Sequence, residues 1–203
     1  PHRQTTMKKY LLAALLAAPS LSASAFSTAE LTRILQKPDN IQGSFIQYRH
    51  LKSLSKPMAT TGKFVLMPKR GLLWQMQKPF AAVLRVRSDG INQWNGKGWI
   101  MPDTGKMPGQ NRQIKLFLDL IGGDTQGLEK QFDLKLEGSA QKWTLQLTPK
   151  TLVMKQIFNH IDISGDNVVR RIELHEKQGD KTDMQFNGIT VGNPLDEFAK
   201  QSL

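Results

Sequence analysis

The segment GKFVLMPKRGLLWQMQ, residues 62–77, holds two runs of alternating side chains on either side of a basic turn. Phe64 and Leu66 fall on one face of the first run, while Trp74 and Met76 fall on one face of the second. Alternation with a period of two is typical of a β-strand with one buried face. Strands of a parallel sheet show continuous apolar runs instead. The segment therefore predicts two antiparallel strands with large side chains on one face.

The same alternation recurs along most of the chain. It is visible in residues 84–87, 132–137, 143–148, 171–174 and 183–186. Asp89-Gly90 and Asn95-Gly96 are two-residue signals of the kind that join the strands of a hairpin. Counting all such runs predicts about eleven strands in a long antiparallel sheet.

A few stretches have the periodicity of a helix instead. Ser27 and Glu30 fit a capping box at the start of the first, which ends near Pro38. In the middle of the chain one helical face carries the apolar residues Ile114, Phe117, Leu118 and Ile121. A short helix capped by Asp124 and a last one near Pro194 complete the set. Because a sheet with one apolar face needs a cover, either barrel closure or these helices must supply it, and the class is α+β.

The inner face of the predicted sheet is rich in aromatic, methionine and aliphatic side chains. Such residues form adaptable apolar surfaces, so the space between sheet and helices is a candidate lipid-binding cavity. An ordinary packed core carries the same residue types, and the pattern alone favours that interpretation. The candidate cavity residues are Phe45, Phe64, Leu66, Trp74, Met76, Leu84, Val86, Trp94, Trp143, Leu145, Met184 and Phe186.

The N-terminus has the layout of a secretory signal peptide. Lys8 and Lys9 precede the short apolar run 10–18, and Ala23-Ser24-Ala25 matches a cleavage site. We expect cleavage after Ala25, so that residues 1–25 comprise upstream or vector-derived residues plus the signal peptide. Residues 26–203 are then expected to form a single domain in the periplasm of a Gram-negative bacterium.

Composition excludes several classes of protein. Lys and Arg number 28 against 17 Asp and Glu, the formal net charge is +11, and Cys is absent. The absence of Cys excludes a disulfide scaffold, a thiolate metal site, a Cys nucleophile and a lipid anchor on Cys. The basic residues are spread along the chain without a basic-aromatic motif, so a nucleic-acid partner is not expected.

The histidines of the predicted mature chain match no catalytic motif. They are His50, His160 and His175. The sequence around His175 lacks the helical H-E-x-x-H spacing of a zinc enzyme, and Ser164 lies outside any G-x-S-x-G elbow. The sequence therefore predicts neither an enzyme nor a metal site nor a cofactor.

Four motifs in order span nearly the whole predicted mature chain. They are residues 43–47 (GSFIQ), residues 61–80 with their basic turn, Trp74 and Pro79, residues 86–94 (VRSDGINQW), and residues 147–150 (LTPK). Together they resemble the LolA family, the periplasmic carriers of outer-membrane lipoproteins. A divergent LolA-like branch is the nearer resemblance, because the details around residues 71–74, 78–80 and 122–124 differ from the main carrier.

The resemblance implies an unclosed, curved half-barrel of eleven antiparallel strands with helices over its concave face. It favours the cavity over the ordinary core, and makes the helix with Ile114, Phe117, Leu118 and Ile121 a lid. The implied function is a monomeric carrier of lipoprotein acyl chains or lipid, between an inner-membrane export complex and an outer-membrane acceptor. Alternatives are an RseB-like lipid-sensing module and a carrier of a non-lipoprotein lipid such as an aryl polyene. Pro68 stands where the family has a lid-latching arginine, so either Arg70 is a latch in a shifted place or the latch is absent.

Overall fold

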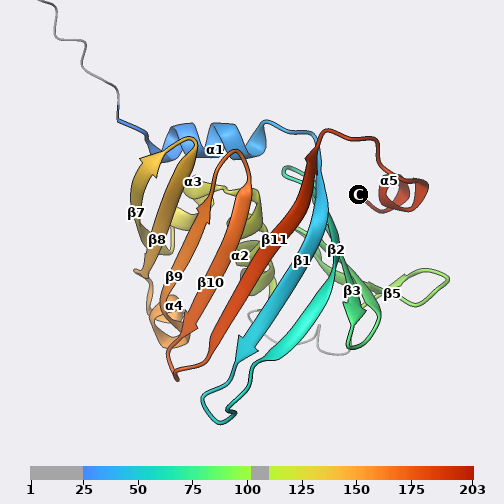
Figure 1. The fold of residues 1–203 in the computed structure, drawn as a ribbon, viewed down its shortest axis with the longest axis horizontal. Coiled ribbons are helices and arrows are strands. Elements are labelled where there is room, and N and C mark those ends of the chain that lie inside the picture. Colours follow the sequence, from blue (N-terminus) through green and yellow to red (C-terminus); the bar gives the residue numbers. More distant parts are fainter. Residues whose placement is uncertain (1–24, 102–109) are drawn as a thin grey trace, which may run out of the picture.

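The computed structural model describes residues 25–101 and 110–203, and in these residues eleven strands form one antiparallel sheet (Figure 1). The sheet order is β6-β5-β4-β3-β2-β1-β11-β10-β9-β8-β7, so β6 and β7 are its two edges and the sheet is not closed. This confirms the predicted half-barrel. The strands are β1 (Ile41–His50), β2 (Met58–Met67), β3 (Gly71–Lys78), β4 (Ala82–Arg87), β5 (Gly90–Trp94), β6 (Trp99–Ile100), β7 (Phe132–Ser139), β8 (Lys142–Pro149), β9 (Phe158–Gly165), β10 (Val169–Glu176) and β11 (Lys181–Val191).

Helices cover the concave face of this sheet. α2 and α3 lie in the connection between the edge strands, and α2 contacts β4 and β5 in one half of the sheet and β10 in the other. α1 runs along one end of the sheet, and α2 lies behind the strands in this view (Figure 1). The helices within the described residues are α1 (Thr28–Gln36), α2 (Gln110–Gly122), α3 (Thr125–Glu129), α4 (Leu152–Ile157) and α5 (Glu197–Ser202).

Ser27 caps the first helix as the sequence predicts. Its hydroxyl accepts a hydrogen bond of 3.2 Å from the backbone N–H of Glu30, and Leu31 is fully buried on the inner face of the helix. Thr32 and Thr125 share a hydrogen bond of 2.6 Å between their hydroxyl groups. This bond holds α1 against α3 at one end of the concave face.

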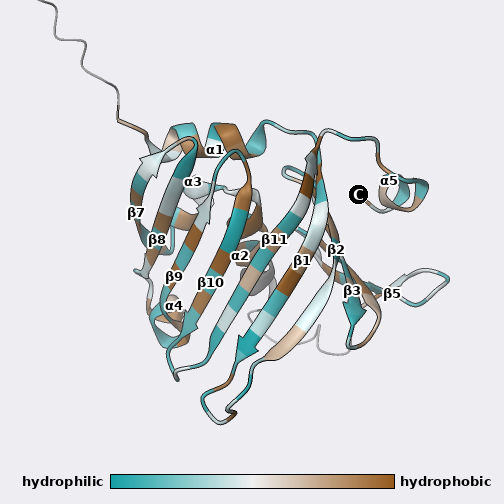
Figure 2. Ribbon diagram, in the orientation of Figure 1, coloured by the Kyte–Doolittle hydropathy of each residue, from teal (hydrophilic) through white to brown (hydrophobic). Residues whose placement is uncertain are grey.

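Bands of apolar and polar residues alternate along the strands (Figure 2). In β8, Trp143, Leu145 and Leu147 are buried while the residues between them are exposed. The buried members face the helices and join a continuous core with residues of α1, α2 and α3. The period-two pattern of the sequence therefore corresponds to one packed face and one solvent face.

Two helices differ from the sequence prediction. α4 was not predicted, because its six residues are too few to show a helical stripe; Thr151 caps it by accepting from the N–H of Met154. α5 begins at Glu197 rather than near Pro194, since Asp196 is its N-cap and accepts a 2.7 Å hydrogen bond from the N–H of Ala199.

The predicted signal peptide falls almost wholly on residues 1–24, which lie outside the described part of the chain. Among the helices that the structure describes, none has the length and apolar character needed to cross a membrane.

Candidate functional site

An aromatic cluster occupies the centre of the concave face. The rings of Phe45 and Trp74 are stacked with centroids 3.6 Å apart, and Phe64 meets Phe186 edge-on at 5.3 Å. Phe117 of α2 packs edge-on against Trp74 at 5.7 Å. These rings come from β1, β2, β3, β11 and the covering helix, so the cluster joins both halves of the sheet to α2.

Strand register explains why these rings meet. Phe45 lies opposite Phe186 in the β1–β11 pairing, and Phe64 lies opposite Trp74 in the β2–β3 pairing. Gly62 lies opposite Phe45 on the neighbouring strand. A Cβ atom at Gly62 would be 2.9 Å from Cε1 of Phe45 and would overlap the carbonyl oxygen of Gln75. A glycine is needed there chiefly because the backbone of Gln75 on β3 approaches so closely, and the Phe45 ring fills the remaining space.

The inner face continues with the other candidate cavity residues. Leu66, Val86, Trp143, Leu145 and Met184 are buried in the same core as the aromatic cluster, and Met76 and Leu84 pack against it while partly exposed. The indole N–H of Trp143 donates a 2.7 Å hydrogen bond to the carbonyl oxygen of Asp166, so its polar atom is satisfied. Eleven of the twelve candidates thus share one apolar surface.

Trp94 is the exception, because it lies on the convex face. In the β4–β5 pairing, Gln93 is opposite the inner-face residue Leu84, so the next residue, Trp94, points to the other side. There it packs edge-on against Phe198 of α5, with ring centroids 5.1 Å apart. Sequence alternation alone could not fix which face Trp94 occupies, because β5 has few apolar residues from which to read the phase.

The helix α2 covers the cluster with one apolar side. Phe117 and Leu118 are partly buried against the core, and Ile121 is buried, as the sequence suggests for a lid. Leu116 and Leu120 are buried as well, and the sequence analysis missed them. Ile114 belongs to α2, but its side chain lies outside what the structure describes.

The same helix buries a carboxylate. Asp119 is 7% exposed and accepts a 3.2 Å hydrogen bond from Nζ of Lys115. Burial raises the pKa of Asp119 above its ordinary value, and the opposing attraction of Lys115 does not cancel this effect. The carboxylate lies against Gly127, so its charged form is disfavoured while α2 is packed against α3.

Among the described residues, a cavity of about 10 Å³ lies between α2 and the sheet, lined by Ile41, Phe64, Ile121, Val168 and neighbouring residues. This volume is about the minimum for one water molecule. The structure therefore shows the arrangement in which the apolar face of the sheet is covered by α2.

Arg70, the candidate latch, is exposed in the turn between β2 and β3. It lines a surface depression with Gln36, Lys37 and Asp39 from the end of α1. Its side chain makes no ion pair or hydrogen bond with any residue that the structure describes. The latch role of Arg70 stays a prediction.

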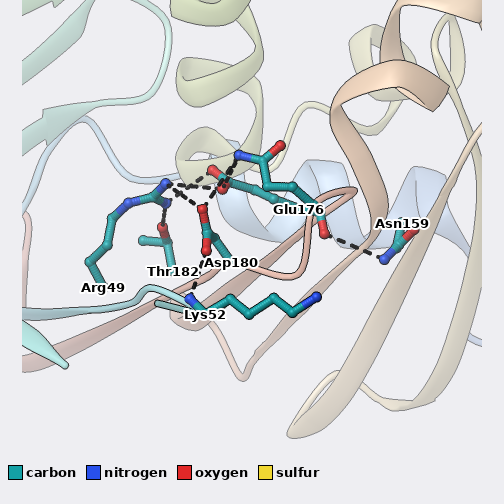
Figure 3. Close-up of polar contacts among 7 residues, drawn as sticks. Arg49, Lys52, Asn159, Glu176, Asp180 and Thr182 are labelled. Carbon is teal, nitrogen blue, oxygen red and sulfur yellow. Dashed lines mark hydrogen bonds and ion pairs between the residues drawn. The ribbon is translucent and has the colours of Figure 1, made fainter. Parts of the chain in front are cut away.

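At one end of the sheet, a polar cluster fastens β1 to the β10–β11 hairpin (Figure 3). The guanidinium of Arg49 donates to both carboxylate oxygens of Glu176, at 3.0 and 2.9 Å, and to the hydroxyl of Thr182 at 2.8 Å. The hydrogen bond to Glu176 raises the pKa of Arg49. Asp180 accepts from the backbone N–H of Lys52 at 2.8 Å. Because every member has a partner, we interpret the cluster as structural.

The fold and the site define an unclosed half-barrel whose apolar concave face is covered by a helix. The chain belongs to the family described as outer membrane lipoprotein carrier protein LolA-like, whose model matches residues 20–193. It is 23% identical over 199 residues to the outer-membrane lipoprotein carrier protein of Pseudomonas putida (strain W619), covering 92% of this chain and 90% of that relative.

Solved structures share the fold. A crystal structure of MucB is similar with a TM-score of 0.52 at 15% identity, covering 87% of this chain. The chain spans only 62% of the length of MucB. A LolA-superfamily protein of Nitrosomonas europaea aligns with a TM-score of 0.47 at 7% identity, covering 88% of this chain and 98% of that one.

Proposed function

We propose that the protein is a periplasmic carrier that shelters the acyl chains of a lipoprotein or lipid on its concave face during transport from the inner to the outer membrane. Family membership supports this proposal. The observation that carries it is the continuous apolar face formed by eleven of the candidate residues and covered by one helix, α2. The partners are an inner-membrane export complex and an outer-membrane acceptor, and the carrier acts as a monomer without enzymatic activity.

The energetics suit uptake followed by release. Burying a sixteen-carbon chain is worth about 12 kcal/mol, at about 0.8 kcal/mol for each CH₂ group. The chain must displace Leu116, Phe117, Leu120 and Ile121 from the sheet, and these side chains gain roughly 6–12 kcal/mol in total from burial. Because one apolar partner replaces another, net affinity is moderate and the lipid can leave for an acceptor.

A single substitution in α2 tests the lid. Phe117→Asp places a charge against Trp74 and on the surface that an acyl chain would contact. We expect binding of a fluorescent fatty acid to fall at least tenfold, with circular dichroism unchanged. The matched control is Phe80→Asp, the same change at a side chain that is 81% exposed. Equal affinity in both variants would contradict the role of α2.

The cargo is identified by native mass spectrometry of protein purified from its own host. A bound triacylated lipoprotein supports the lipoprotein-carrier form of the proposal. A free polyene or another lipid supports a carrier for a separate export route. Failure to recover any lipid, together with no affinity for an acyl probe, would overturn the carrier proposal.

A further inference from the structure

Four polar side chains form a square on the convex face, opposite the apolar site. His160 and Asp162 lie on β9, and Glu173 and His175 lie on β10. In the pairing of these strands, His160 is opposite His175 and Asp162 is opposite Glu173. The residue between the first two, Ile161, is fully buried in the core, so all four side chains point to the other face.

Three of these side chains bring their donor atoms together. Nε2 of His160 lies 3.2 Å from Oδ2 of Asp162, and Nε2 of His175 lies 3.5 Å from the same oxygen. The two imidazole rings are stacked with centroids 4.0 Å apart. One donor atom from each of the three residues lies within 4.8 Å of the others. Ligands held at about 2.0–2.2 Å by a tetrahedral ion are about 3.4 Å from one another, so little movement is required.

We propose that His160, Asp162 and His175 form a binding site for a zinc-class divalent cation on the convex face. Two imidazoles and one carboxylate suit Zn²⁺ and similar transition metals, whereas Ca²⁺ and Mg²⁺ prefer oxygen ligands. The three side chains are 34%, 42% and 26% exposed, so an ion reaches them from solvent. Three protein ligands leave a fourth position for water.

With Asp162 counted, three carboxylates and two basic residues, Arg171 and Lys181, surround the site, so its net charge favours a cation. Oε2 of Glu173 lies 3.0 Å from Nε2 of His175, and its other oxygen is 2.6 Å from the guanidinium of Arg171. The guanidinium of Arg171 also donates two hydrogen bonds to the carboxylate of Asp183, at 3.0 and 2.8 Å. One guanidinium thus faces the carboxylates of Glu173 and Asp183, with Asp162 beside them. Arg171 holds Glu173 beside the site, and because Glu173 contacts the same Nε2 of His175 that would bind the ion, the ion would take the place of this contact.

The sequence analysis expected no metal site because it looked for helical spacing. The signal is instead H-x-D on one strand and E-x-H on the next, and only the register of β9 against β10 brings the two together. The bound ion would link these strands across the convex face. Because it binds the folded state, it would raise the melting temperature by mass action. This effect is independent of lipid binding on the concave face.

Calorimetric titration of the chelator-treated full chain with Zn²⁺ tests the site, with Co²⁺ absorption as a second readout. We expect one ion per chain, a rise in melting temperature, and tetrahedral Co²⁺ bands. We expect Zn²⁺ affinity to fall at least ~10-fold in each of three variants, His160→Ala, His175→Ala and the isosteric Asp162→Asn. Loss of a residue that only supports a metal ligand already lowers affinity by this factor, so loss of a ligand should lower it at least as much. Circular dichroism verifies that each variant is folded.

The control is His50→Ala. His50 lies two strands from His175, with Lys181 paired between them, so it is out of reach of the same ion. This variant should bind Zn²⁺ like the unaltered chain. Absence of saturable binding in the unaltered chain would overturn the proposal. So would equal affinity in His50→Ala, His160→Ala and His175→Ala, which would assign the ion to other residues.

Discussion

At the scale of single residues, Gly62 determines whether the aromatic cluster can form. The ring of Phe45 stacks on Trp74 through the space that a side chain at Gly62 would occupy. Sequence analysis identified the glycine as part of a family motif. Its physical reason is the close approach of the Gln75 backbone on β3 and of the Phe45 ring on β1, which depends on strand register and is visible only in the structure.

Gly62→Ala should therefore lower the free energy of unfolding. We expect a loss of about 1–3 kcal/mol, the usual result of forcing extra atoms into a packed core. Urea denaturation followed by tryptophan fluorescence measures it. Gly98→Ala is the matched control, because a Cβ atom there has no neighbour within 4 Å. Equal stability of both variants would mean that the Gln75 backbone and the Phe45 ring can both shift at no cost.

Asp119 makes the stability of the lid-covered state depend on pH. Burial raises the pKa of Asp119 in the folded protein above the ordinary value of 3.8. At pH values between the ordinary pKa and the raised pKa, Asp119 is protonated more often in the folded than in the unfolded state. Its contribution to the free energy of unfolding therefore grows as the pH falls. Above the raised value its burial is a constant penalty.

Comparing the chain with Asp119→Asn as the pH is lowered from 7 towards the ordinary carboxyl pKa of 3.8 isolates this effect. We expect the difference in unfolding free energy to shift in favour of unaltered protein as the pH is lowered. Urea denaturation at each pH provides the measurement. Parallel stability profiles would show that Asp119 is not protonated in the folded state over this range.

At the scale of elements, α2 is the one that carries the proposed lid movement. The chain has no Cys, so Leu120→Cys introduces a single thiol at a position that is 1% exposed. We expect slow labelling by a thiol reagent without ligand and faster labelling when a fatty acid displaces α2. Leu152→Cys, at a position 73% exposed, should label rapidly under both conditions. If fatty acid did not change the labelling rate of Leu120→Cys, the proposed displacement of α2 would be contradicted.

Elements with long, regular patterns could be predicted from the sequence, whereas short ones could not. The cap at Ser27 and the apolar stripe of α2 are local signals, and both helices form where expected. α4 has only six residues, of which Met154 is buried and Ile157 packs partly buried against the core, too few to form a recognisable stripe. The face of Trp94 was not predictable because the phase of β5 is set by its pairing with β4.

At the scale of the whole molecule, the register between neighbouring strands could not be predicted from the sequence alone. Alternation predicted the number and type of strands, and the family resemblance supplied the half-barrel. The square of His160, Asp162, Glu173 and His175 needed the actual register, because the two halves of its pattern are separated by the turn between β9 and β10. Local chemistry is therefore readable from sequence, while sites assembled across strands are not.

The pairing of β1 with β11 also determines how the chain must fold. Ile41 pairs with Val191, so the middle of the sheet joins segments from opposite ends of the chain. All other pairings connect strands that are consecutive in sequence and can form early as hairpins. The central seam has to wait for closure of a loop that includes most of the chain, which carries the largest entropy cost. Until then, β1 and β11 each have one edge with unpaired backbone groups. The incompletely folded protein is therefore most prone to self-association through these two strands, which lie in the middle of the sheet once it is folded.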